Sequence, residues 1–210
     1  MAARGALRLI LRTAAFAAAL ALSPAAAGQA HERTLLLVAK PGMSDPNFRE
    51  TVVLVTQDEK ANAVGLILNR PTQRSLASIL PGERFKRFTE PVFFGGPVEA
   101  NGLFALFRAE ASPGEAVAIL PGVFLAGNPA TLDALMHKPP SSIRLYAGYS
   151  GWGPAQLRGE LERGDWHVLN ADAETVFTKD TRDLWNRLLR MARTVTAHAP
   201  PTEMFAKQLE

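Results

Sequence analysis

Short apolar stretches separated by polar turns run through the first half of the chain. Thr34–Lys40, Thr51–Gln57 and Ala63–Asn69 are rich in Val, Leu and Ile and are bounded by Pro, Gly, Asp and Asn, which is typical of strands between turns. The turn-rich segment 41–46 joins the first two stretches, and segment 58–62 is short enough for a hairpin. This pattern predicts an antiparallel meander.

The second half of the chain mixes the strand pattern with helical spacing of apolar residues. Further strands are expected at 91–94, 102–107, 116–120, 123–126, 142–149 and 166–169. Helices are expected at 75–80, 129–136, 154–163 and 181–192. Asn128 should cap the second of these helices, because Pro129 suits the first helical position. The chain shows no internal repeat and no second domain boundary, so a single domain is expected.

The N-terminus follows a different pattern. The first 31 residues contain no acid, and Arg4, Arg8 and Arg12 precede an apolar run at 13–22. Small residues at Ala25–Ala27 follow the run, where a signal peptidase would cleave. This arrangement is typical of a secretory signal, and the run is too short for the roughly 20 residues of a membrane span. We therefore expect a signal peptide at 1–27, a domain at 28–196, a flexible tail at 197–210 and a periplasmic or secreted protein without a permanent membrane anchor.

Two alternatives to export stay open. Arginines spaced by four also form a basic helical face, as in an organellar transit peptide. The other alternative is an uncleaved segment or a misassigned start, in a protein that stays in the cytoplasm.

Composition narrows the possible functions. The 210 residues include 23 Lys and Arg and 20 Asp and Glu, with 47% hydrophobic residues, which suits one globular domain. Loss of the three N-terminal arginines leaves 20 basic and 20 acidic residues, and no basic run exceeds pairs such as Lys86–Arg87. Binding to nucleic acid requires clustered basic side chains, so it is disfavoured.

Metal and thiol chemistry are also disfavoured. The chain has no cysteine, which excludes disulfides, thiolate nucleophiles and cysteine-based zinc sites. Its histidines are scattered, without ligand pairs at helical spacing: His31, His137, His167 and His198. We expect neither a metal nor a cofactor.

The segment Gly148–Leu161 reads GYSGWGPAQLRGEL and admits three interpretations. It falls one residue short of the G-x-S-x-G elbow that would make Ser150 a nucleophile, and only His167 and His198 follow as candidate bases. Its glycines could hold an anion against a helix start, although the lysine of a phosphate-binding loop is missing. The third interpretation is that the glycines permit close packing and positive backbone dihedrals.

Asn69–Arg70–Pro71 ends an apolar strand and raises a similar question. Pro71 restricts Arg70 to extended backbone, which projects its guanidinium at the sheet margin. There Arg70 could bind a carboxylate or phosphate of a ligand, or form an internal ion pair with an acid such as Asp45 that holds two loops together. Gly95–Gly96–Pro97 likewise permits either a turn or a close backbone approach to a ligand.

Four separated motifs together resemble one family. They are Met43–Phe48 with Thr51–Val53, Gly65–Pro71, Gly95–Val98, and Gly148–Pro154 with Gln156–Leu157. Their order and spacing resemble the YqgE/AlgH family of bacterial proteins over residues 35–189. The resemblance implies an α+β fold built on a barrel-like sheet with helices around it, and no established enzymatic activity.

The resemblance also bears on function. Members of the family carry a label as transcriptional regulators, which fits poorly with a neutral mature chain that lacks a helix-turn-helix pattern. Members also commonly carry alanine or cysteine where this chain has Ser150, which argues against a nucleophile and implies a turn in which Trp152 packs or anchors a ligand.

We therefore predict a non-catalytic binding or regulatory module whose partner is an unidentified protein or a small anionic ligand. The alternative is a hydrolase or transferase that acts on a small anionic substrate, with Arg70 as anion holder and Asp45 as acid or base. A cleft that unites Asp45, Arg70 and Ser150 would favour the enzyme. The predicted binding residues are Asp45, Asn69, Arg70, Pro71, Gly95, Gly96, Pro97, Trp152 and Gln156.

Overall fold

The structure is a computed structural model that describes residues 34–57, 62–137, 139 and 142–196. The predicted signal peptide at 1–27 and the predicted tail at 197–210 lie outside the described residues. The strands are β1 (Thr34–Ala39), β2 (Val52–Gln57), β3 (Ala63–Ile67), β4 (Pro71–Ser75), β5 (Pro91–Phe94), β6 (Val98–Arg108), β7 (Val117–Leu120), β8 (Val123–Ala126), β9 (Ile143–Trp152) and β10 (Trp166–Asn170). The helices are α3 (Leu76–Ile79), the 3-10 turn η4 (Glu83–Phe85), α4 (Pro129–His137), α5 (Gln156–Glu162), α6 (Ala173–Val176) and α7 (Leu184–Thr196).

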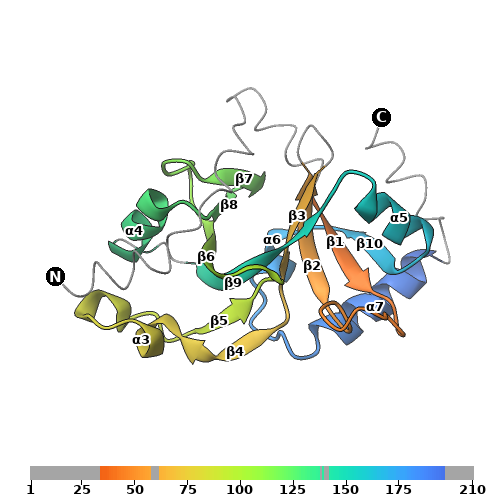
Figure 1. The fold of residues 1–210 in the computed structure, drawn as a ribbon, viewed down its shortest axis with the longest axis horizontal. Coiled ribbons are helices and arrows are strands. Elements are labelled where there is room, and N and C mark those ends of the chain that lie inside the picture. The colour runs from red at the N-terminus through yellow and green to blue at the C-terminus, as the bar shows by residue number, and fades with distance from the viewer. Residues whose placement is uncertain (1–33, 58–61, 138, 140–141, 197–210) are drawn as a thin grey trace.

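All ten strands form one sheet that curls into a half-barrel (Figure 1). Its main path runs β10-β1-β2-β3-β9-β6-β8-β7, with β4 paired to β5 and β5 paired to β9. Every pairing is antiparallel except that of β5 with β9. The predicted α+β class and the barrel-like, mostly antiparallel sheet are therefore confirmed.

The curl creates one inner core and two outer ones. The inner core gathers Leu36 and Leu54 from the first strands, Leu106 from β6, and the buried face of α7. One outer core lies between β6, β8 and β9 and the segment of α3, η4 and α4. The other lies between β1, β2, β3 and β10 and a cover made of Phe48 and α5.

This arrangement explains why the first strands are apolar without alternation. All six residues of β1 are buried, because Leu35 and Leu37 face the α5 side while Leu36 and Val38 face α7. A strand that is covered on both faces needs apolar side chains at every position. The predicted meander of β1, β2 and β3 is present, with register pairs such as Val53 with Ile67.

The structure corrects one feature of the glycine-rich segment. Gly148–Trp152 was expected to form a strand-to-helix turn after a strand that ends at residue 149, but β9 continues through Trp152. Gly65 pairs with Ser150 and Ala63 pairs with Trp152, so backbone pairing with β3 extends the strand. The turn comes later, at 153–155.

Three short elements were not predicted from the sequence. β4 reads PTQRS, and its mostly exposed side chains leave no apolar alternation to detect. η4 and α6 span three and four residues, too few for helical periodicity to be visible. The predicted cap of α4 is confirmed, because the Thr131 amide donates to Asn128 Oδ1 at 2.8 Å.

Candidate functional site

The connection between β1 and β2, residues 41–51, is a mostly exposed loop whose backbone is held by side chains from the turn between β3 and β4. We call it the 41–51 loop. Asn69 fixes its last turn: the amide of Val52 donates to Asn69 Oδ1, and Asn69 Nδ2 donates to the Glu50 carbonyl, both at 2.9 Å. Glu50 has a φ of 56°, a left-handed conformation that non-glycine residues seldom adopt. Asn69 therefore stabilises a strained corner.

Arg70 holds the middle of the same loop. Its Nη1 donates to the Asn47 carbonyl at 2.5 Å, and its Nη2 donates to the carbonyls of Pro46 at 3.3 Å and Arg49 at 2.9 Å. Burial lowers the pKa of Arg70, while the nearby charges of Asp45 and Glu50 act in the opposite direction. Of the two roles predicted for Arg70, the geometry is that of an internal tie, made to backbone carbonyls instead of a carboxylate.

Asp45 contributes locally to the loop. Its Oδ1 accepts a hydrogen bond from the Asn47 amide at 2.8 Å, while its side chain remains exposed to solvent. Such a bond from the amide two residues ahead is the usual turn-forming contact of an aspartate. The Asp45 carboxylate thus shapes the turn and still points a charge outward.

An aromatic cluster anchors the loop to the sheet. Phe48 is buried against two tryptophans: its ring stacks on Trp152 with centroids 5.4 Å apart, and it meets Trp166 edge-on at 5.5 Å. Trp152 is the last residue of β9 and Trp166 is the first residue of β10, and the centroids of their rings are 6.4 Å apart. Trp152 is only 3% exposed, so it packs inside the protein instead of presenting its ring to a ligand.

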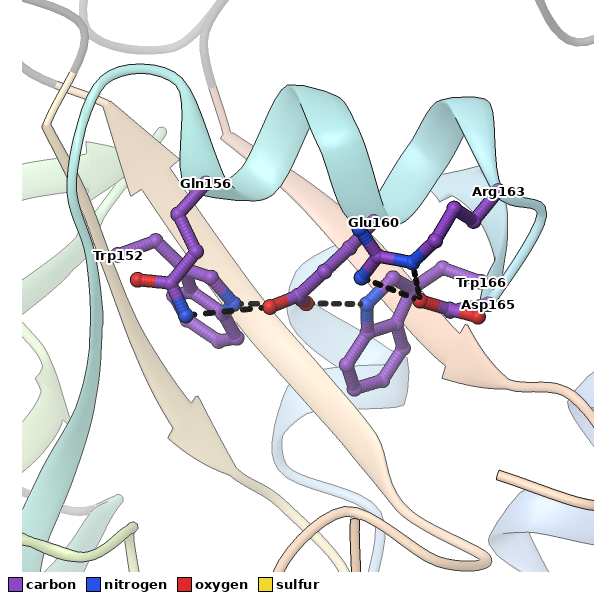
Figure 2. A network of polar contacts seen from close by, with 6 residues as sticks. All are labelled: Trp152, Gln156, Glu160, Arg163, Asp165 and Trp166. Atoms are coloured by element: carbon purple, nitrogen blue, oxygen red, sulfur yellow. Dashed lines mark hydrogen bonds and ion pairs between the residues drawn. The ribbon is translucent and has the colours of Figure 1, made fainter. Parts of the chain in front are cut away.

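One carboxylate from α5 joins the two tryptophans (Figure 2). Both indole Nε1 atoms, of Trp152 and of Trp166, donate to Glu160 Oε2 at 2.9 Å, and Gln156 Nε2 donates to Glu160 Oε1 at 3.2 Å. Hydrogen bonds to a charged acceptor are stronger than neutral ones. Glu160 therefore holds α5 against the sheet, in the same core cluster as Phe48.

Glycines at two positions allow β9 to lie against the turn between β5 and β6. A methyl group on Gly95 would overlap the Gly148 carbonyl oxygen, and one on Gly96 would overlap Ser150. Ser150 is completely buried, and its Oγ donates to the Gly95 carbonyl at 3.1 Å. The glycines thus serve close packing, and Ser150 is a buried strand residue without the exposure that a nucleophile elbow requires.

The comparisons with known proteins point to one family. A model of the family described as AlgH-like matches residues 36–196, which is most of the chain. The chain belongs to the AlgH-like family. The resemblance inferred from the four motifs is therefore confirmed.

Relatives and solved structures agree with this assignment. The UPF0301 protein CT0663 of Chlorobaculum tepidum is 34% identical, over 74% of this chain and 83% of its own length. A UPF0301 protein of Myxococcus xanthus is 35% identical, over 74% of this chain and 87% of its own length. The solution structure of the AlgH protein from Pseudomonas aeruginosa aligns with a TM-score of 0.64 at 27% identity, covering 85% of this chain and 97% of that one.

A more distant structure supports the fold alone. The crystal structure of protein DIP2367 from Corynebacterium diphtheriae aligns with a TM-score of 0.59 at 22% identity, over 75% of this chain and 85% of that one. The names of these relatives state neither a substrate nor a partner.

The family motifs divide into three places in the fold. Asp45, Asn69 and Arg70 meet around the 41–51 loop, with Pro71 exposed just beyond. Trp152 and Gln156 meet at Glu160. Gly95 and Gly96 are buried beside β9, and Pro97 is exposed next to them.

Sequence reasoning missed two residues that organise the first two places: Phe48, which joins the 41–51 loop to Trp152, and Glu160, which joins Trp152 to Gln156. Phe48 lies within a recognised motif, but nothing in its neighbourhood indicates that its ring reaches the ends of β9 and β10. Glu160 lies in a predicted helix four residues after Gln156, a spacing that places both on one face. The tertiary structure alone brings the indole donors of Trp152 and Trp166 to the Glu160 carboxylate.

The described residues offer no cluster for a metal ion. Within ranges 34–57, 62–137 and 142–196, no group of three His, Asp or Glu side chains converges. In the same part of the chain, none of the helices has the length and apolar character that crossing a bilayer requires.

Proposed function

We propose that this AlgH-like protein is a non-catalytic binding module that presents the 41–51 loop as its recognition surface. The observation that carries the proposal is that a largely exposed polar loop is held rigidly from within. Asn69 and Arg70 occupy four of its backbone carbonyls, and Phe48 anchors it among tryptophans. The side chains of Asp45, Arg49 and Glu50 remain exposed on this fixed backbone.

Such an arrangement favours binding for an entropic reason. Fixing a loop in advance removes the ordering cost that a flexible loop incurs when it meets a partner. The strained backbone of Glu50 supports the same interpretation, since strain persists where the surrounding structure imposes it and often marks a functional site. Asn69, Arg70 and Trp152 then act as positioning residues, while Asp45 and the exposed Pro71 contact the partner.

Pro97 and Gln156 remain predicted binding residues on neighbouring elements. A protein or small-molecule partner of this loop must satisfy two carboxylates and one guanidinium, because Asp45, Arg49 and Glu50 all point outward. A regulatory role would follow from partner capture and requires no chemistry at the site.

The test compares capture by charge-neutralised variants. Asp45→Asn combined with Glu50→Gln removes two charges and keeps the hydrogen-bonding shape of both side chains. Glu110→Gln combined with Glu115→Gln makes the same charge change at exposed positions between β6 and β7. Pull-downs from the native compartment, quantified by mass spectrometry, should show several-fold lower capture with the first variant and unchanged capture with the second. Equal capture by both would overturn the proposal.

The rival hydrolase or transferase makes a different prediction. It needs Ser150 or Asp45 in a cleft with Arg70, whereas Ser150 is buried and the Arg70 guanidinium is directed at three carbonyls. Ser150→Ala should keep partner capture within a few-fold. If an activity on small anionic esters is found and falls a thousandfold in this variant, the enzyme hypothesis replaces the binding module.

A further inference from the structure

The last helix, α7, has two contrasting faces. One face enters the inner core through Leu184, Leu188, Leu189 and Ala192. The period of 3.6 residues places the polar residues Arg187, Arg190 and Thr194 away from that core, where they are exposed together with the apolar Met191. In Figure 1, α7 lies along β1 and β10, away from α5 and the cover of the second outer core.

The outer face of α7 concentrates positive charge. The helix contains three arginines, Arg187, Arg190 and Arg193, and no acid, although residues 28–210 as a whole carry 20 basic and 20 acidic side chains. Among the described residues, these arginines form one ion pair, from Arg190 Nη2 to Asp183 Oδ2 at 3.4 Å. Both partners are more than half exposed, so the pair is weak, and the three arginines outnumber the single aspartate.

The positive field continues from α7 onto the sheet. The pKa of His167 in β10 is lowered. Burial is the main cause, and the positive charges of Lys40 and Arg193 add to it. Lys40 directly follows β1, and the Ala39 carbonyl accepts a hydrogen bond from Trp185 Nε1 of α7 at 2.7 Å. Lys40 and Arg193 therefore both contribute positive charge near His167, beside the helix.

We infer that the outer face of α7 docks on an anionic phospholipid bilayer. Its arginines match lipid phosphates, which guanidinium groups bind in bidentate fashion. Met191 adds an apolar group: it is 52% exposed and one of two large hydrophobic side chains that are exposed among the described residues, the other being Ile79. Basic side chains around an exposed apolar one, on a helix about 20 Å long, suit a helix that lies in the plane of a membrane interface.

An acidic soluble partner is the competing occupant. Such a partner would use the same arginines, but it would not require an exposed methionine between them. The bilayer is therefore favoured by Met191, and the test must separate the two sources of negative charge.

The experiment measures co-sedimentation of the full chain with vesicles. Vesicles of phosphatidylcholine with about 30% phosphatidylglycerol, which supplies the anionic phosphates, are compared with vesicles of pure phosphatidylcholine. Both are measured at low and at high salt. Arg187→Glu with Arg190→Glu should lower the partition to anionic vesicles at least about tenfold. Because all variants share the N-terminal apolar run, the difference between them reports α7 alone.

The matched control reverses two charges elsewhere. Arg74→Glu with Arg158→Glu makes the same change in net charge at exposed positions on β4 and α5. This control should bind anionic vesicles as the unmodified chain does. Met191→Ser should weaken binding several-fold, whereas Arg187→Lys with Arg190→Lys should retain most of it.

Several outcomes would overturn the inference. Equal partition of the α7 variant and its control would do so, as would equal binding to anionic and neutral vesicles. Binding to poly-glutamate or DNA, lost in Arg187→Glu with Arg190→Glu and accompanied by no binding to vesicles, would assign the face to a soluble polyanion instead. Circular dichroism of each variant checks that α7 still folds.

Discussion

The two outer faces of the half-barrel are covered in different ways. Over β6, β8 and β9, the cover consists of α3, η4 and α4, which pack through apolar side chains such as Phe85, Phe88 and Leu132. Over β1, β2, β3 and β10, the cover consists of the 41–51 loop and the seven-residue α5, which polar ties from Asn69, Arg70 and Glu160 hold in place.

This difference shows where the fold uses polar chemistry to control a surface. A helix satisfies its own backbone and needs only an apolar face to dock. A loop has unpaired carbonyls, and burying part of it requires donors from elsewhere. The loop cover therefore depends on a few identifiable side chains, whereas the helical cover distributes its stability over many contacts.

The largest effect is expected from the aromatic anchor of each cover. Phe48→Ala and Phe88→Ala remove side chains that are 9% and 7% exposed, and each should lower the free energy of unfolding by about 3–5 kcal/mol. Only Phe48→Ala should also shift tryptophan emission, because Phe48 contacts Trp152 and Trp166. Denaturant unfolding followed by fluorescence measures both. An emission shift in Phe88→Ala of the same size would contradict the separation of the covers.

Arg70 should come next. Arg70→Ala removes three hydrogen bonds from a charged donor and should destabilise the fold by about 2–3 kcal/mol. Arg70→Lys should recover little, because an ammonium cannot reach three carbonyls in a fixed fork. The counterpart in the other cover is Arg84→Ala, which breaks a partly exposed ion pair to Asp133 and should cost under about 1 kcal/mol. Similar losses from Arg70→Ala and Arg84→Ala in thermal melts would show that the loop cover has no special dependence on its ties.

A smaller effect is expected at Glu160. Glu160→Gln keeps an oxygen for the indole donors but removes the charge, so the loss should be about 1 kcal/mol. Asp133→Asn in α4 is the matched change in the other cover and should stay within about 0.5 kcal/mol. Hydrogen exchange should reveal the consequence locally, with faster exchange in α5 for the first variant. Unchanged protection of α5 would indicate that packing alone holds the helix.

The smallest effect concerns the pH dependence of stability, and it involves His167, which belongs to neither cover. Burial, then Lys40 and Arg193, lowers the pKa of His167, so the unfolded chain binds the proton more tightly than the native protein. The stability that His167 contributes is present above about pH 6.5 and is lost as pH falls towards the lowered native pKa. His167→Gln should therefore weaken the drop in melting temperature between pH 7.5 and pH 5.5. An identical drop in both proteins would mean that His167 does not contribute.

Local pattern predicted most strands correctly because their signal is local. Apolar runs bounded by turn residues marked β1, β2 and β3, and β8 was predicted at its observed bounds. β4 was not predicted because it lies at an edge of the sheet with mostly exposed side chains, which need no apolar pattern. The glycine-rich segment was misinterpreted as a turn because pairing of Ser150 with Gly65, 85 positions earlier in the chain, keeps it extended.

The candidate site shows the same division. The sequence by itself determined that Asn69 and Arg70 lie close to the end of an apolar strand and that the chain shares its motifs with the AlgH-like family, and it offered close packing as one interpretation of the glycines. Only the tertiary structure decided which atoms Arg70 binds, that Trp152 is buried, and that Glu160 receives both indoles. The physical reason is that propensity and hydrophobic period depend on neighbours along the chain. Hydrogen-bond partners and burial depend on which distant segments the curled sheet brings together.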